Sequence, residues 1–410
     1  MIILFVALPL VVAGILPLVG KVSRRVVPDL LANAALLFLL VYAAITGRHL
    51  IAGGPVLQQL SWFGEPVAIR LALDGFSLLM LLAIALVGLA ACLFSIDYME
   101  HYGAKANYYA LFLVMVAGMN GLVLATDLFS VYLFMEVAAV ASYALVAFGL
   151  GQDELEAAFK YLMLSVVATA FILASVAVIF GMTGSLEFAA VAKALQELNA
   201  GAALGVASAF FLVGFGLKAA LIPFHAWLPD AHPSAPAPIS AVLSGLLIKV
   251  SGIYAMTRIF LNVFGLTPAL STVLMSLGTL SMVVAAFLAL GQKDMKRMLA
   301  YSSISQVGYI VLGIGIGTPL GIAGGLFHLF NHALAKGLLF LTSGSVQQAT
   351  GTRNLDEMGG LAKRMPITAA TNLVGALSIV GVPPLNGFWS KLVIIIALIQ
   401  AGHPVFAVIA

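Results

Sequence analysis

The sequence, 410 residues long, contains very little charge and almost no cysteine. Asp, Glu, Lys and Arg make up 9% of it, against about a quarter of an ordinary soluble domain, which excludes a water-soluble enzyme of this size. The single cysteine, Cys92, excludes a disulfide framework, a cysteine metal cluster and a CxxC redox pair. Because 62% of the residues are hydrophobic, we expect the chain to work inside a lipid bilayer.

Motifs that would hold an energy source or a redox group are missing as well. The sequence has no Walker motif, dinucleotide fingerprint, CxxCH or paired haem histidines. The glycine-rich stretch 313–325 has no strand before it and no phosphate-binding lysine after it, so close helix packing by small residues explains it better. We therefore expect no cofactor, no metal, no nucleic-acid ligand and no redox site in the chain, and its status as part of an enzyme stays open.

Long apolar runs are abundant instead. A helix needs about 20 apolar residues to cross a bilayer. The opening Met-Ile-Ile-Leu run lacks the basic n-region and the A-x-A cleavage site of a signal peptide, so it is interpreted as a retained first helix. The runs lie near 1–20, 29–46, 76–95, 108–125, 129–149, 157–181, 203–226, 236–260, 269–290, 301–316, 319–348 and 366–400. They predict an all-α polytopic membrane protein with about twelve visible transmembrane helices.

The placement of the 19 lysines and arginines predicts the orientation. With the N-terminus on the outer face, ten of these residues fall in inner loops: Lys21, Arg24, Arg25, Lys105, Lys293, Lys296, Arg297, Arg353, Lys363 and Arg364. Four fall in outer loops: Arg48, Arg70, Lys193 and Arg258. This excess satisfies the positive-inside rule and predicts a multi-pass protein of the cell inner membrane with its N-terminus outside.

Six charged residues fall inside the apolar runs: Glu136, Lys160, Lys218, Lys249, Lys336 and Lys391. Each would cost about 2.5–3.5 kcal/mol near the bilayer centre unless it is paired or lines water, and function is the simplest reason to tolerate that cost. Lys160 follows an acidic loop, so an anchor that snorkels to the inner interface explains it equally well.

Two of the runs also contain helix breaks beside these lysines. Pro223 lies five residues after Lys218, and Gly381, Pro383, Pro384 and Gly387 precede Lys391. Proline removes a backbone donor and clashes with the preceding turn, and irregular backbone at membrane depth is tolerated only where it is buried in protein or lines a wet cavity. The broken helices are therefore interpreted as parts of an ion path.

The spacing of the lysines suggests a duplication. Lys160 precedes Lys218 by nearly the same interval by which Lys336 precedes Lys391. An odd number of helices separates the two pairs, so the second unit would be inverted, as in many secondary transporters. The expected division is 1–100 for the N-terminal helices, 101–262 for the first repeat and 263–410 for the second, which ends inside an apolar stretch and is expected to be incomplete.

Three histidines add groups that can carry protons. His328 and His332 lie on one helical face, with Lys336 one turn further along. Their ordinary pKa near 6.5 suits proton transfer at physiological pH, whereas metal binding is disfavoured because no Asp, Glu or Cys completes a site on that helix. His225, beyond the Pro223 break, is a candidate for the point where the path meets the cytoplasm.

Several of these segments together resemble a known family. They are YLFMEVAAVASYALVAFG around Glu136, EAAFKYLMLS at 156–165, GFGLKAALIPFHAWLPDAHPSAPAPISAVLSGLLIKVSG at 214–252, KDMKRMLAYSSISQVGYI at 293–310, HLFNHALAKGLLFLTSGSV at 328–346 and VGVPPLNGFWSKL at 380–392. They resemble the antiporter-like proton-translocating subunits of the respiratory complex I superfamily, which also occur in multisubunit cation/proton antiporters and membrane-bound hydrogenases.

The resemblance implies fourteen helices in two inverted five-helix repeats, with helices seven and twelve broken and the last two absent here. It implies that Glu136 pairs with Lys218, that Lys249 bridges the halves, and that Lys391 belongs to the output half-channel. It further implies that His328, His332 and Lys336 form a central relay.

The function implied is proton translocation through two half-channels, in a redox-driven complex of complex I or hydrogenase type. One alternative is a D-type subunit of a multisubunit Na⁺/H⁺ antiporter driven by ion gradients, and another is a structural scaffold subunit. The implied partners are other membrane subunits, protons or Na⁺, and the lipid bilayer.

Overall fold

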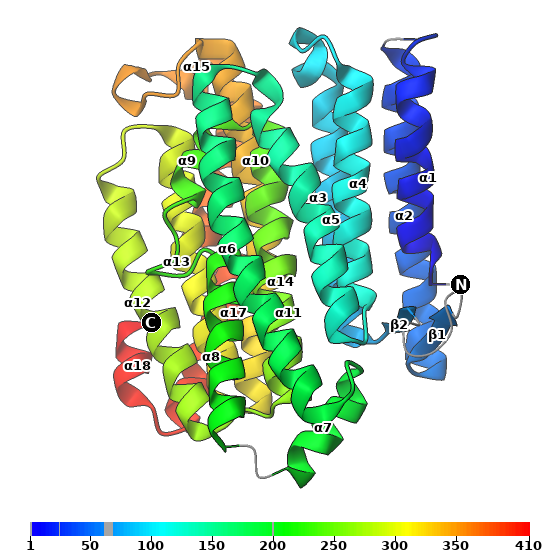
Figure 1. Ribbon diagram of the computed structural model, residues 1–410. Coiled ribbons are helices and arrows are strands. Elements are labelled where there is room, and N and C mark those ends of the chain that lie inside the picture. Colours follow the sequence, from blue (N-terminus) through cyan, green and yellow to red (C-terminus); the bar gives the residue numbers. More distant parts are fainter. Residues whose placement is uncertain (1, 24, 61–68, 199–200) are drawn as a thin grey trace.

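The computed structural model describes residues 2–23, 25–60, 69–198 and 201–410 as a bundle of long helices (Figure 1). Among these residues nine helices are long and apolar enough to cross a membrane, and three shorter apolar helices accompany them. The prediction of an all-α polytopic membrane protein is confirmed. Arg24, counted above among the inner-loop residues, lies outside the described residues.

The long helices follow the predicted apolar runs in order. They are α1 (Leu4–Val19), α2 (Val26–Gly53), α3 (Gly75–Tyr98), α4 (Lys105–Leu124), α5 (Leu128–Val146), α6 (Gln152–Thr183), α8 (Gly201–Lys218), α12 (Pro268–Leu290), α13 (Met295–Gly315), α14 (Pro319–Thr350), α16 (Pro366–Val380) and α17 (Asn386–Gln400). The run 236–260 forms a continuous helical segment made of α10 (Ala237–Val242), η3 (Leu243–Tyr254), α11 (Ala255–Arg258) and η4 (Ile259–Val263).

Shorter elements close the two ends of the bundle. The helical ones are η1 (Met99–His101), η2 (Ala147–Gly149), α7 (Phe188–Glu197), α9 (Leu228–Ser234), η5 (Leu355–Glu357), α15 (Leu361–Arg364) and α18 (Pro404–Ile409). The sequence did not predict the one small sheet found among the described residues, in which β1 (Val56–Leu60) pairs antiparallel with β2 (Ile69–Leu73) so that Val56 faces Leu73.

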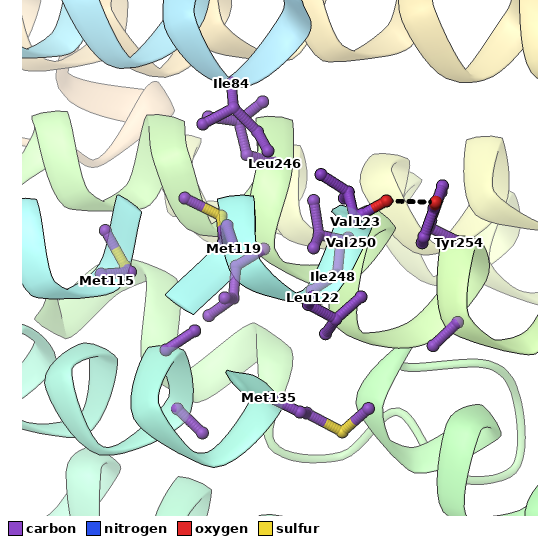
Figure 2. Close-up of a cluster of buried hydrophobic side chains, with 14 of the residues drawn as sticks. Ile84, Met115, Met119, Leu122, Val123, Met135, Leu246, Ile248, Val250 and Tyr254 are labelled. Carbon is purple, nitrogen blue, oxygen red and sulfur yellow. Dashed lines mark hydrogen bonds between the residues drawn. The ribbon is translucent and has the colours of Figure 1, made fainter. Parts of the chain in front are cut away.

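The segment Ala237–Val263 is the central helix of the bundle. Every residue of η3 is buried, and η3 and η4 are π-helices, a rare i→i+5 form that is often found at functional sites. Figure 2 shows apolar side chains of α3, α4, α5 and η3, among them Ile84, Met119, Met135 and Val250, packed together. The Tyr254 hydroxyl donates to the Val123 carbonyl at 2.6 Å, which ties the outer part of this helix to α4.

Both predicted helix breaks are present. α8 ends at Lys218, Ala220 has a left-handed φ of +55°, and α9 begins only at Leu228. α16 ends at Val380 and α17 begins at Asn386. A left-handed non-glycine residue costs about 1–3 kcal/mol and is typical of functional sites, so the first break is held by its surroundings.

Backbone carbonyls freed by the breaks are satisfied by side chains. Trp227 Nε1 donates to the Leu217 carbonyl at 2.9 Å. At the second break Lys391 Nζ donates to the carbonyls of Ile379 at 2.8 Å and Val380 at 3.3 Å. Side-chain donors therefore replace the hydrogen bonds that a continuous helix would supply.

The same pattern of two backbone hydrogen bonds, here called a ladder, occurs twice in the chain. Each residue of the second ladder follows its counterpart in the first by the same number of positions. The first ladder has Leu128 N–H to Leu186 O at 2.9 Å and Phe188 N–H to Thr126 O at 3.0 Å; the second has Met295 N–H to Arg353 O at 3.0 Å and Leu355 N–H to Lys293 O at 2.8 Å. Leu128 thus corresponds to Met295, and Leu186 to Arg353. The ladders lie near α7 and α15, which are at opposite ends of the bundle (Figure 1).

This register corrects the pairing of lysines made from their spacing. At the offset that the ladders define, Lys336 corresponds to Thr169, and Lys160 corresponds to Phe327. Lys160 and Lys336 therefore lie at different positions of α6 and α14 in this register, although the intervals from Lys160 to Lys218 and from Lys336 to Lys391 are similar.

Candidate functional site

Lys218 lies at the centre of the first cluster of polar groups. Its side chain is 4% exposed, and Nζ lies 3.2 Å from Glu136 Oε1 and donates to Ser165 Oγ at 2.6 Å. Two unit charges at such a distance attract by about 4 kcal/mol at an effective dielectric of 20. Two charges at mid-membrane cost about 5–7 kcal/mol together, at about 2.5–3.5 kcal/mol each, so the attraction offsets a large part of the cost of keeping both groups charged.

Lys218 and Lys391, the lysines beside the two helix breaks, each place a positive charge at the C-terminus of a half-helix. Lys218 is the last residue of α8, and Lys391 reaches back from α17 to the last carbonyls of α16. A helix C-terminus carries partial negative charge and stabilises a cation. Each break therefore has a lysine at the C-terminus of its first half-helix. Lys218 comes before its break in the sequence, whereas Lys391 comes after its break.

A small cavity extends from Lys218 towards η3. It measures about 10 Å³, about the space that one water needs. Its lining residues come from α6, α8, η3 and the broken segment: Tyr161, Ser165, Leu217, Lys218, Trp227, Leu247, Ile248 and Ser251. Since Ser165, Lys218 and Ser251 give it polar groups, a water there could join Lys218 to the helix that carries Lys249.

Lys249 and Lys336 are both fully buried where η3 meets α14. Lys249 Nζ donates to the Ser244 carbonyl. Lys336 Nζ donates to Leu299 O at 2.9 Å and to Ser302 Oγ at 2.5 Å. η3 and α14 approach each other closely here, since a Cβ added at Gly245 would lie 3.2 Å from Ala333 O.

His328 and His332 lie on α14 between Lys336 and the contact of α14 with α17. Their rings lie nearly parallel with centroids 6.2 Å apart. His328 Nδ1 lies 2.9 Å from Ser390 Oγ and Nε2 lies 3.1 Å from Gln306 Oε1, with the tautomer unassigned. Both nitrogens of His332 are buried and have no hydrogen-bond partner among the described residues. Since buried polar groups nearly always bind protein or water, His332 is expected to bind water.

Lys391 follows Ser390 and ends this series. Its Nζ lies 4.5 Å from the centre of the Tyr309 ring, a cation–π contact. An open groove of about 760 Å³ between α12, α13 and α16 reaches Lys391, Tyr309 and Gln306. The structure thus pairs Glu136 with Lys218, places Lys249 and Lys336 in the buried centre of the bundle, and joins His328 to Ser390, the neighbour of Lys391.

Lys160 and His225 lie beside this series. The Lys160 side chain is 49% exposed and pairs with Glu156 at 2.7 Å and with Asp230 at 3.5 Å. His225 lies in the broken segment, its Nδ1 has no hydrogen-bond partner within the described part of the chain, and its ring is 6.2 Å from that of Tyr301.

Sequence reasoning assigned two lysines to inner loops that the structure buries. Lys105 is 5% exposed and its Nζ lies 2.8 Å from Asp29 Oδ2, while Lys296 is 2% exposed and donates to Ala235 O at 2.8 Å. Both residues lie in the first turn of a helix, where charge alone suggests a loop. Sequence reasoning also missed Ser165, whose hydroxyl gives no signal among many serines.

Buried lysines at two helix breaks, joined through further lysines and histidines, define a membrane protein of the ion-translocating class. Residues 125–410 match the family described as NADH:quinone oxidoreductase/Mrp antiporter, TM, and residues 63–109 match NADH-ubiquinone oxidoreductase (complex I), chain 5 N-terminus. The chain belongs to this family and is one of its antiporter-like subunits.

Similar proteins cover most of the chain. NADH-quinone oxidoreductase subunit N of Desulforudis audaxviator is 37% identical, over 99% of this chain and 82% of that protein. The D-type subunit of the Na⁺/H⁺ antiporter of Alkalihalophilus pseudofirmus is 35% identical, over 100% of this chain and 83% of that protein. A chain of the Mrp complex from Dietzia sp. superposes with a TM-score of 0.93 at 33% identity, covering 100% of this chain and 76% of that chain.

Proposed function

We propose that the chain moves protons across the membrane as the antiporter-like subunit of a redox-driven complex of complex I or hydrogenase type. The observation that carries this proposal is the Lys218–Glu136 contact of 3.2 Å at the break of α8. A nearby carboxylate favours the charged form of a buried lysine, and its departure disfavours it. A movement that separates the pair would therefore make Lys218 release its proton.

The released proton would follow the series of polar groups. It would pass from Lys218 through the cavity beside Ser251 to Lys249, and then to Lys336 and the histidine pair. From His328 it would reach Lys391 by way of Ser390. When Glu136 returns, Lys218 would take up a new proton from the inner side, where His225 and Lys160 lie nearest to the inner surface.

Two repeats, 101–262 and 263–410, are part of the proposal, after N-terminal helices within 1–100. The two ladders, which match at one constant offset along the chain and lie at opposite ends of the bundle, support an inverted duplication. The two breaks, each with a lysine charge at a half-helix C-terminus, support it as well.

The proposed location is the bacterial inner membrane with the N-terminus outside. The excess of ten inner over four outer basic residues supports this orientation. The proposed partners are other membrane subunits, because the similar chain of the Mrp complex belongs to a multisubunit assembly.

A D-type subunit of a Na⁺/H⁺ antiporter is the second candidate. The relative from Alkalihalophilus pseudofirmus and the similarity to the Mrp complex favour it. In that candidate the same buried groups would carry protons, and an ion gradient would drive the transport in place of electron transfer. A scaffold role is disfavoured, because mid-membrane lysines joined in series are costly in a purely structural part.

Everted vesicles that contain the whole complex test these proposals. Proton movement would be followed by quenching of a pH-sensitive dye after a reductant is added or after a Na⁺ pulse. Lys218→Met and Glu136→Gln should lower the initial rate by at least about tenfold with normal assembly, whereas Lys363→Ala, in exposed α15, should leave it within about twofold. Wild-type rates in both site variants would refute the proposal. Transport started by the reductant would favour the redox-driven complex, and transport started by the Na⁺ pulse would favour the Na⁺/H⁺ antiporter.

A further inference from the structure

The two ladders differ in what lies along their outward edge. In the first ladder the N–H and the hydroxyl of Thr126 donate to the carbonyl of Arg70 on β2, at 3.3 Å and 3.0 Å. Leu71 on β2 forms an antiparallel bridge with Ala125. The β1–β2 sheet therefore covers the edge of the first ladder, at the α7 end of the bundle (Figure 1).

The same edge of the second ladder is uncovered. In the ladder register Thr126 corresponds to Lys293, and Ala125 corresponds to Gln292. The Lys293 N–H has no hydrogen-bond partner among the described residues, and the Lys293 side chain is 76% exposed. An unpaired backbone donor on an exposed edge is a template for another strand, so the second ladder presents an open pairing position.

Apolar side chains beside this edge are uncovered as well. On α4, Asn120 and Val123 are 2% and 1% exposed, and Asn120 Nδ2 donates to the Phe5 carbonyl of α1 at 2.8 Å. Their counterparts on α12 in the ladder register, Phe287 and Leu290, are 71% and 83% exposed. An apolar face of α12 therefore lies open where the matching face of α4 is buried.

The hollows beside the two ladders also correspond. The first, of about 530 Å³, is lined by Ala125 and Phe188 and has β1 and β2 as a wall. The second is the groove of about 760 Å³ described above, which is lined by the counterparts Gln292 and Leu355 and by no described strand. The second repeat thus lacks a segment in the place that β2 takes in the first.

We propose that an extended segment of a neighbouring membrane subunit pairs with Gln292 and Lys293, here called the docking edge, as β2 pairs with the first ladder. Strand addition of this kind gives affinity through main-chain hydrogen bonds and specificity through alternate side chains. A carbonyl of the segment accepts from the Lys293 N–H, and its apolar side chains cover Phe287 and Leu290. The docking edge concerns assembly alone, so it goes beyond the proposed function and applies to either driving force.

The charges at the docking edge specify the chemistry of the segment. In the first ladder Arg70 lies opposite Thr126, and its guanidinium pairs with Glu187. In the second ladder Lys293 replaces Thr126 and Asn354 replaces Glu187. Opposite charges stabilise a directly facing pair of strand residues, and like charges destabilise it. The residue in the place of Arg70 is therefore an Asp or a Glu.

A second copy of this chain does not fit the docking edge. Its β1–β2 sheet lies at the α7 end of the bundle, whereas the docking edge lies at the α15 end (Figure 1). Two copies that have the same orientation in the membrane keep these ends on opposite sides. The segment therefore belongs to a different subunit.

Residue-resolved hydrogen exchange on the intact complex tests the pairing. The Lys293 N–H should exchange at least about a hundredfold more slowly than in an unstructured peptide, because a paired strand amide must open before it exchanges. The Thr126 N–H, which donates to Arg70 O, is the reference within the same chain. Exchange of the Lys293 N–H at the unstructured rate, beside a slow Thr126 N–H, overturns the docking edge.

A photoreactive benzophenone side chain in place of Lys293 identifies the occupant. In the intact complex it should cross-link to one stretch of one co-purified subunit, and that stretch should contain an Asp or Glu and lie outside a membrane-spanning helix. The same group in place of Lys193, exposed on α7, should not yield that peptide. Cross-links to lipid alone, or to a second copy of this chain, overturn the proposal.

Lys293→Glu tests the acidic residue on the segment. Because it places like charges opposite each other, the amount of the cross-linked subunit that co-purifies should fall by at least about tenfold. Lys293→Ala removes the ion pair with Asp356 but adds no repulsion, and Lys363→Glu changes the charge equally on α15; both should stay within about twofold. Equal co-purification in Lys293→Glu and Lys363→Glu overturns the acidic residue opposite Lys293.

Discussion

Lys218 has two partners that contribute in different ways. Glu136 supplies the charge that can be moved away, whereas Ser165 on α6 supplies a fixed acceptor at 2.6 Å. The Ser165 hydroxyl also accepts from Tyr143 at 2.5 Å. In the proposed mechanism, Ser165 would hold the lysine amine on the wall of the small cavity while the Glu136 carboxylate moves.

Replacing Ser165 should weaken transport without stopping it. In Ser165→Ala the ammonium keeps Glu136 but loses a hydrogen bond, and hydrogen bonds to charged groups contribute about 1.5–3 kcal/mol. The initial rate of proton uptake in everted vesicles should fall by about tenfold, the factor that corresponds to about 1.4 kcal/mol. The matched control is Ser175→Ala, since Ser175 on the same helix is buried and donates to Ala207 O away from the lysines. Equal rates in the two variants would contradict this role.

Asp74 should make stability depend on pH at the outer end. Burial alone would raise the pKa of Asp74. The hydrogen bond and charge of Arg258, together with the hydrogen bonds of Ser77, lower it by more than that, so the pKa of Asp74 lies below its ordinary 3.8. A depressed pKa means that the stabilisation is present at neutral pH and is lost as the pH falls through the folded-state value.

Asp74→Asn keeps the helix cap but removes the charge. It should lower the thermal unfolding midpoint of the purified complex at neutral pH, with a loss of about 1 kcal/mol or less because the group is 36% exposed. The difference from the unsubstituted protein should shrink below pH 3.8. Asp356→Asn, in an exposed pair with Lys293, is the control and should change little. A difference that persists in acid would argue against the charge as its cause.

At the residue scale, the sequence could predict the burial of charged residues that interrupt apolar runs, but not the burial of charged residues at helix ends. Lys249 and Lys336 stand out because their neighbours are apolar on both sides. Lys105 and Lys296 sit beside polar residues, and their burial depends on Asp29 and on the Ala235 carbonyl, which come from distant parts of the chain. Such contacts are set by tertiary packing, which the local pattern does not contain.

At the scale of elements, proline and glycine predicted both helix breaks because their effect on the backbone is local. The π-helical form of η3 was not predicted, since it arises where the central helix is packed on all sides. Close packing is clearest at Gly252, where an added Cβ would lie 2.5 Å from the N and Cα atoms of Ala219. Ala219 directly follows Lys218, so this contact fixes the break against η3.

Gly252→Ala should therefore disturb the site through the backbone. A Cβ cannot fit without moving Ala219, and such overpacking typically costs about 1–3 kcal/mol. We expect a lower unfolding midpoint and a proton-uptake rate reduced by about tenfold, since Lys218 would shift relative to Glu136. The control is Gly205→Ala on α8, where nothing among the described residues lies within 4 Å of the added Cβ. Normal transport in Gly252→Ala would mean that the position of the break tolerates displacement.

At the scale of the whole molecule, the two ends of the bundle differ in charge, and this difference is the basis of the proposed orientation. The loops and short helices at the end with α15 carry most of the exposed basic residues predicted for the inner face, whereas α7 lies at the other end (Figure 1). In the orientation proposed above, which follows the positive-inside rule, α15 lies on the cytoplasmic side and α7 lies outside.

Cysteine labelling tests this orientation, because the chain has a single native cysteine, Cys92, which is buried and should give little background. Lys363→Cys on α15 and Lys193→Cys on α7 put an exposed thiol at each end. With a membrane-impermeant maleimide, Lys363→Cys should react in everted vesicles and stay unlabelled in intact cells, and Lys193→Cys should do the reverse. The opposite pattern would invert the proposed orientation. Labelling of both thiols from one side only would contradict a bundle that spans the membrane between α7 and α15.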